Sequence, residues 1–199
     1  ETQGSFTLYS YMHKMFQEAD NTKVKALKHL VKDQNFKSAY IKAEELFTKG
    51  IDHPKMDELK RIIDSTLFQN PKSKIIVFNH YRASASNIEK NLNLNPLVKA
   101  KLFVGQLKKY GIGLTQKEQF QIIEDFKTDV YNVLVSTSIG EEGLDIPKVD
   151  LVIFYEPVPS AIRSIQRRGR TARHHKGRLI VLMAKNSRDE TYHWVSHNK

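Results

Sequence analysis

The chain has 199 residues, 40% of them hydrophobic, which is enough to bury one sizeable core with room for an appended piece. Its 32 lysines and arginines exceed its 22 acidic residues and give a net charge of +10. Nucleic acid is therefore the leading class of partner, although a basic surface without a binding role would carry the same charge. The absence of cysteine excludes disulfides and thiolate chemistry, and apolar runs no longer than a strand predict a cytoplasmic protein with no membrane contact.

The first 50 residues carry apolar side chains at intervals of three and four, which predicts two or three amphipathic helices. Gly50 is predicted to stop the last of these helices, and Pro54 to lie in the first turn of the next one. We therefore expect two domains, at residues 1–52 and 53–199. The exposed lysines of the first domain form either a solvated helix face or a contact surface for nucleic acid, and they include Lys23, Lys25, Lys28 and Lys32.

Beyond residue 70 the chain alternates short β-branched runs with helical stretches. This alternation is typical of an α/β domain in which helices flank a mainly parallel sheet. Thr115 and Glu118 have the spacing of a capping box, which predicts a helix start. Strands are predicted at residues 74–78, 100–104, 130–136, 151–155 and 178–183, and helices at 83–92, 115–126, 159–169 and after 187.

Polar segments follow several predicted strands, where ligands of open α/β sheets bind. Segment 79–82 (Asn-His-Tyr-Arg) either contacts a phosphate or only caps a helix, and segment 103–106 contains a glycine at a strand end. Segment 136–147 combines hydroxyls, two glycines and three carboxylates, which is more polar than a simple connection requires. These segments are the candidate binding loops.

Segment 166–173 (Gln-Arg-Arg-Gly-Arg-Thr-Ala-Arg) is the most strongly charged part of the sequence. Its guanidinium groups suit either a triphosphate, as arginine fingers do, or the backbone of a nucleic acid. The chain contains no G-x-x-x-x-G-K-[ST] phosphate loop, so a nucleotide site would be incomplete. No metal site is predicted, because His174 and His175 lack the spacing of zinc ligands.

Two of these segments resemble conserved motifs of superfamily-2 helicases. Segment 136–145 (Ser-Thr-Ser-Ile-Gly-Glu-Glu-Gly-Leu-Asp) resembles motif V, and segment 166–173 resembles motif VI. Segments 79–82 and 103–106 fall where motifs IV and IVa belong. A further segment, 157–166, reads Pro-Val-Pro-Ser-Ala-Ile-Arg-Ser-Ile-Gln. Together with motif V, its sequence is similar to that of the archaeal Hef helicase-nuclease and Fanconi anaemia M translocase family. One departure is Ala172, where the relatives often have glycine.

The resemblance implies a RecA-like fold and the second motor domain of an ATP-dependent enzyme. Arg170 and Arg173 would reach the γ-phosphate of ATP, while the first motor domain of the same polypeptide would hold ATP and Mg²⁺. Gln166 would link ATP to the domain interface, and Gly143 and Asp145 would lie against the nucleotide. The helical prefix would be the C-terminal part of an insertion domain, and the chain would be a piece of a longer protein.

The resemblance also implies movement along branched or forked DNA in replication-fork repair. Thr137, Gln106 and Arg82 would hold the nucleic-acid backbone. Two alternatives remain open at this point: an RNA-directed superfamily-2 helicase, and a stand-alone nucleic-acid-binding module that kept the fold without the motor.

Overall fold

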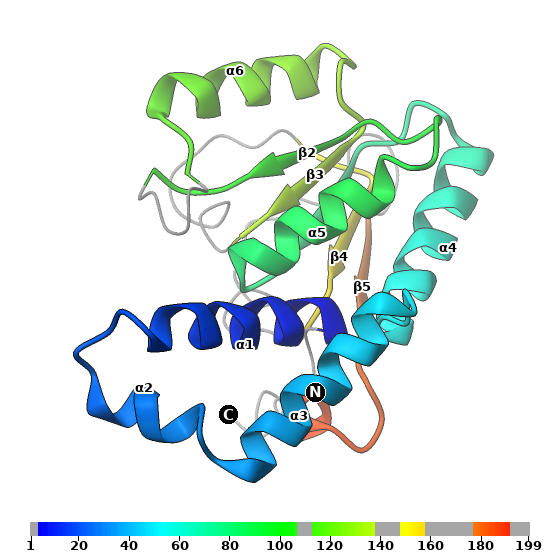
Figure 1. Ribbon diagram of the computed structural model, residues 1–199. Helices are drawn as coiled ribbons and strands as arrows, with labels where there is room; N and C mark the ends of the chain where they lie inside the picture. The colour runs from blue at the N-terminus through cyan, green and yellow to red at the C-terminus, as the bar shows by residue number, and fades with distance from the viewer. Residues whose placement is uncertain (1–3, 107–112, 138–147, 158–176, 192–199) are drawn as a thin grey trace. The chain divides into compact units, whose positions relative to one another are not determined.

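The computed structural model describes residues 4–106, 113–137, 148–157 and 177–191 (Figure 1). The chain divides into two compact units, Glu1–Pro54 and Lys55–Lys199. No helix in the described ranges is both long enough and apolar enough to cross a membrane.

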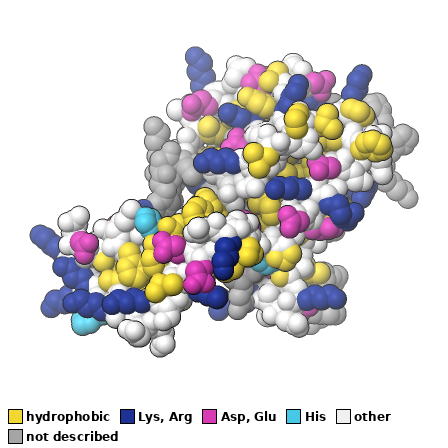
Figure 2. Space-filling view, turned by 45° about the vertical axis from the view of Figure 1, so that its right-hand side comes forward, with side chains coloured by type: hydrophobic (Ala, Val, Ile, Leu, Met, Phe, Trp, Pro, Cys, Tyr) yellow, Lys and Arg dark blue, Asp and Glu magenta, His cyan; other side chains and the backbone are white. Residues whose placement is uncertain are grey.

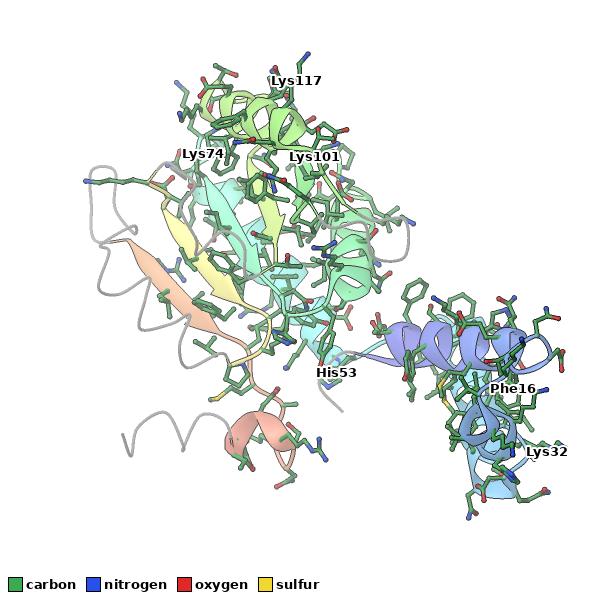
Figure 3. All side chains as sticks on the ribbon, turned by 90° about the vertical axis from the view of Figure 1, so that its left-hand side faces the viewer. Phe16, Lys32, His53, Lys74, Lys101 and Lys117 are labelled. Atoms are coloured by element: carbon green, nitrogen blue, oxygen red, sulfur yellow. The ribbon has the colours of Figure 1, made fainter. Side chains whose placement is uncertain are left out.

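The first unit consists of helices α1 (Ser5–Ala19), α2 (Lys25–Leu30) and α3 (Gln34–Thr48). Aromatic rings join α1 to α3: Tyr9 stacks on Phe47 with ring centroids 4.5 Å apart, and the Phe16 ring lies 4.6 Å from that of Tyr40. Figure 3 labels Phe16 in this helical unit. Aromatic pairs of this kind stabilise a small helical unit whose aliphatic core is limited. Gly50 follows α3 with a φ of 65°, a left-handed conformation that suits glycine.

Lysine side chains project from α2 and its flanking turns. Figure 2 shows Lys and Arg side chains gathered over this part of the first unit. Their ammonium groups repel one another unless salt or an anion screens them. We call this surface the α2 basic face, and it comprises the exposed residues Lys23, Lys25, Lys28 and Lys32.

The second unit is built on a five-stranded, entirely parallel sheet with the strand order β2-β3-β1-β4-β5 (Figure 1). Helix α4 precedes the sheet and begins at Pro54, as the sequence predicted. The remaining elements are β1 (Ile75–Phe78), α5 (Arg82–Leu92), β2 (Ala100–Phe103), α6 (Gln116–Lys127), β3 (Val133–Ser136), β4 (Leu151–Phe154) and β5 (Arg178–Val181).

The three central strands, β3, β1 and β4, are buried on both faces. In β1, Ile75 and Val77 face a core shared with α4 and α5, whereas Ile76 and Phe78 face a core shared with α6. Burial on both faces explains why these three strands are almost continuous apolar runs instead of alternating ones. The predicted α/β sheet with flanking helices and a helical prefix is therefore confirmed.

Two local predictions are tested closely by the structure. The capping box is confirmed, because the Thr115 side chain accepts the Glu118 N–H and the Glu118 carboxylate accepts the Thr115 N–H. The predicted start of the third strand is wrong, because β3 begins at Val133 and not at residue 130. Asp129 has a φ of 69° and the Val130 N–H donates to Asp125 O at 2.9 Å, so these residues terminate α6.

Candidate nucleic-acid interface

The carboxyl edge of the sheet brings together residues that are far apart in the sequence. Strands β2, β3 and β1 are consecutive in the sheet, and Gln106, Thr137 and Arg82 follow them respectively. Neighbouring strands lie about 4.8 Å apart, so their loops share a short stretch of this edge. The three residues predicted to hold a nucleic-acid backbone thus follow adjacent strands, Gln106 and Thr137 in loops and Arg82 at the first residue of α5. Their role in binding remains a prediction.

Thr137 lies at the centre of this group. Its N–H donates to Phe103 O of β2 at 3.3 Å, and only 3% of the residue is exposed. Among the described residues its hydroxyl has no hydrogen-bond partner. A buried hydroxyl without a partner is costly, so this hydroxyl is a good candidate for a bond to a ligand.

Arg82 is the first residue of α5, and its position depends on Asn79. The Asn79 Oδ1 accepts the Tyr81 N–H at 2.8 Å, and the Asn79 Nδ2 donates to Ser84 Oγ at 3.1 Å. Asn79 is buried, so its amide shapes the loop from within. Arg82 itself is half-buried and begins an 11-residue helix, whose N-terminus carries the positive end of the helix dipole. A guanidinium at this place suits a phosphate.

Gln106 is exposed and follows a segment that a residue of α6 supports. The Gln119 Nε2 donates to Val104 O at 2.8 Å, and Gln119 is buried on the same helix face as Ile122 and Phe126. Sequence reasoning missed Gln119 as a support of this loop. The available signal was a polar residue within the apolar face of a predicted helix.

Glu156 is a second residue that sequence reasoning missed. It follows β4, only 6% of it is exposed, and its carboxylate accepts the His80 N–H from the loop after β1. The available signal was its position directly behind a buried strand, where the other candidate loops were found.

The residues predicted to contact a nucleotide lie outside the described ranges. They are Gly143, Asp145, Gln166, Arg170 and Arg173. Their segments follow on directly from Thr137 after β3 and from Pro157 after β4, two strand ends on the same edge of the sheet. The described residues contain no group of three His, Cys, Asp or Glu side chains placed to hold a metal ion.

A family model described as "Helicase conserved C-terminal domain" matches residues 54–175. Among solved structures, the helicase domain of Hef from Pyrococcus furiosus is similar, with 52% identity and a TM-score of 0.77. That match covers 98% of this chain and 40% of the Pyrococcus chain.

Curated relatives extend the comparison. A Methanocaldococcus jannaschii protein named as an ATP-dependent RNA helicase is 40% identical over 97% of this chain and 24% of its own length. The ATP-dependent DNA helicase mph1 of Neurospora crassa is 37% identical, over 87% of this chain and 15% of that protein. The Fanconi anemia group M protein homolog of Mus musculus is 34% identical, over 96% of this chain and 10% of that protein. The chain therefore spans less than a quarter of each of these relatives.

Proposed function

Because this chain belongs to the family of the helicase conserved C-terminal domain, we propose that it is the second motor domain of an ATP-dependent DNA helicase or translocase. The resemblance to the Hef and Fanconi anaemia M family is confirmed, and the parallel sheet is the RecA-like fold that this resemblance implied. One observation carries the proposal furthest. The buried Thr137 hydroxyl, without a partner among the described residues, sits between the loops of Gln106 and Arg82.

On this proposal the three loops hold the sugar-phosphate backbone and do not read bases. An arginine, a hydroxyl and an amide are side chains that donate to phosphate oxygens, and such contacts position a protein without selecting a sequence. The net charge of +10 favours the approach of a polyanion. A motor that moves along DNA needs this independence from sequence.

ATP fits this chain as one half of a site. The arginine-rich segment offers guanidinium donors for a triphosphate, and the chain has no phosphate loop of its own. Arg170 and Arg173 would then contact the γ-phosphate, Gln166 would connect it to the interface, and Gly143 and Asp145 would lie against the nucleotide. When bound, ATP with Mg²⁺ supplies the free energy of hydrolysis. A first motor domain would hold its phosphates, so this chain alone would not hydrolyse ATP.

The proposed substrate is branched or forked DNA, as at stalled replication forks. Among the relatives, mph1 is named as a DNA helicase and the Methanocaldococcus protein as an RNA helicase. We favour DNA because several of the relatives, including those of Neurospora crassa and Coccidioides immitis, are named as ATP-dependent DNA helicases. In the same proposal the first unit, about residues 1–52, is the C-terminal part of an insertion domain. Its α2 basic face would then contact a branch of the fork.

The proposal is tested with the full-length protein by measuring ATP hydrolysis with forked DNA, single-stranded DNA or duplex RNA as the stimulating nucleic acid. We expect forked DNA to stimulate most. Stronger stimulation by duplex RNA would identify an RNA-directed motor instead. No hydrolysis with any of them would identify a binding module.

The arginine assignment is tested by Arg170→Ala and Arg173→Ala. Each should lower kcat for ATP by about 10³-fold or more, as the loss of an arginine finger does, and should leave DNA affinity nearly unchanged. Arg188→Ala is a matched control, because it removes one positive charge at an exposed position outside these loops. Wild-type kcat in the two variants would exclude the finger role.

A further inference from the structure

An exposed aromatic pair lies in the loop after β1, beside the residues predicted to hold a nucleic-acid backbone. The rings of His80 and Tyr81 meet edge to face, with centroids 4.8 Å apart and an interplanar angle of 86°. Both residues are exposed, and Tyr81 is 53% accessible to solvent. A single exposed tyrosine is common on protein surfaces, so its significance depends on how the chain holds it.

The backbone of Tyr81 is fixed on both sides of its side chain. Its N–H donates to Asn79 Oδ1 at 2.8 Å, and its C=O accepts the Ala85 N–H at 2.9 Å at the start of α5. The preceding residue is held as well, because the His80 N–H donates to the buried Glu156 carboxylate. A tyrosine has only two side-chain torsions to lose on binding, so on a fixed backbone it contacts a ligand at low entropic cost. The loop therefore presents the Tyr81 ring to solvent in a preorganised form.

Polar groups suited to a sugar-phosphate backbone lie next to this ring. Arg82 is the following residue, so the Cα atoms of the two residues are about 3.8 Å apart. Towards the neighbouring strand, the Asn79 N–H donates to Ser136 O at 2.9 Å, one residue before Thr137. The Thr137 hydroxyl is buried and has no hydrogen-bond partner among the described residues. A strand whose phosphates are bound by Arg82 and Thr137 would carry a base within reach of Tyr81.

We propose that Tyr81 stacks on an unpaired base of the DNA strand that binds at this edge of the sheet. This inference rests on the proposed function and adds the form of the strand. Every base has an aromatic face, so stacking on tyrosine tolerates any sequence, as a motor requires. In a duplex each base is paired and stacked on its neighbours, so Tyr81 would contact the strand only where it is single. The perpendicular His80 ring packs against Tyr81 and limits its rotation.

Removing either partner of the stack tests the contact in the full-length protein. Tyr81→Ala removes the ring, whereas Tyr81→Phe keeps the ring and removes only the hydroxyl. On the DNA side, a thymidine oligonucleotide is compared with an abasic oligonucleotide of the same length, which keeps the phosphates and lacks the bases. Phe68→Ala is the matched control, because it removes a ring that is 86% exposed near the end of α4, before the sheet begins. Thermal unfolding verifies the fold of each variant.

Fluorescence anisotropy measures the Kd of each protein for the two strands and for a blunt duplex. Wild-type protein should bind the thymidine strand about 5-fold or more tightly than the abasic strand, the lower range of stacking on one base. Tyr81→Ala should abolish this preference by weakening only the thymidine complex, with the abasic and duplex complexes within about twofold of wild type. Tyr81→Phe and Phe68→Ala should bind as wild type does. The salt dependence of Kd should stay the same, because tyrosine carries no charge.

A residue that only supports the loop would weaken all three complexes by the same factor, and that result in Tyr81→Ala would overturn the inference. Equal wild-type affinities for the thymidine and abasic strands would do so as well, as would a Tyr81→Phe variant without the preference. A wild-type protein that binds none of the three DNAs would instead overturn the proposed function.

Discussion

Replacing Thr137 by valine should make the protein more stable and a weaker binder of nucleic acid. Valine has the shape of threonine with a methyl in place of the hydroxyl. The residue is 3% exposed, and its hydroxyl has no partner among the described residues. Burying an unpaired hydroxyl costs about 1–3 kcal/mol, so even the lower limit predicts a gain of about 1 kcal/mol. For a chain of this size that gain raises Tm by about 2–4 °C.

Binding should change in the opposite direction. A hydrogen bond to a charged phosphate contributes about 1.5–3 kcal/mol, which corresponds to a rise in Kd of about 10-fold or more for Thr137→Val. Fluorescence anisotropy with labelled DNA measures this Kd, and thermal unfolding of the same preparation without DNA measures Tm. The salt dependence of Kd should stay as in wild type, because threonine carries no charge and releases no counterions.

Thr137→Ser is the matched control, since it keeps the hydroxyl and removes only the methyl. It should lower stability by about 1 kcal/mol, the loss of one buried methyl, and leave Kd near the wild-type value. The reasoning fails if Thr137→Val lowers Tm, because the hydroxyl would then have a partner within the protein. It also fails if the valine variant binds DNA as tightly as wild type.

The buried ion pair of Lys55 and Asp189, whose side chains are 4% and 1% exposed, gives a further expected outcome. Asp189→Asn should lower the free energy of unfolding by about 3–5 kcal/mol in urea titrations, because it removes the carboxylate that faces the buried Lys55 charge. Glu45→Ala, which breaks an exposed pair, should cost about 0.5 kcal/mol or less, and similar losses in both variants would contradict this. Burial, followed by a hydrogen bond with Tyr9, raises the pKa of Tyr40 to about 12. An acid whose pKa is higher in the folded state stabilises the fold below the unfolded pKa of about 10 and loses that contribution as pH rises to 12. The stability difference between wild type and Tyr40→Phe should therefore fall between pH 10 and 12, and a constant difference would refute the shift. Changing all four lysines of the α2 basic face to glutamate should weaken the binding of forked DNA and reduce the salt dependence of its Kd. Unchanged binding would show that this face is a solvated surface without a role in binding.

The starts of two helices could be predicted from the sequence alone. Pro54 begins α4 and the capping box of Thr115 and Glu118 begins α6, because such signals act within one turn of helix. The buried, β-branched runs predicted five strands and a parallel sheet. The start of β3 could not be predicted, because Val130 looks like a strand residue. The left-handed backbone of Asp129 decides the outcome, together with an ion pair to the buried Lys74.

The order of the strands, by contrast, was decided only by the tertiary structure. The sequence indicated which loops were polar, but the order β2-β3-β1 is what places Gln106, Thr137 and Arg82 after adjacent strands. The hydrogen bond between Glu156 and His80 was also decided by the tertiary structure, since His80 lies 76 residues earlier in the chain. Helix caps depend on neighbours three or four residues away, whereas these contacts exist only after both faces of the central strands are buried. The sequence by itself therefore determined the elements and their candidate loops, and the packing of the sheet determined which loops meet.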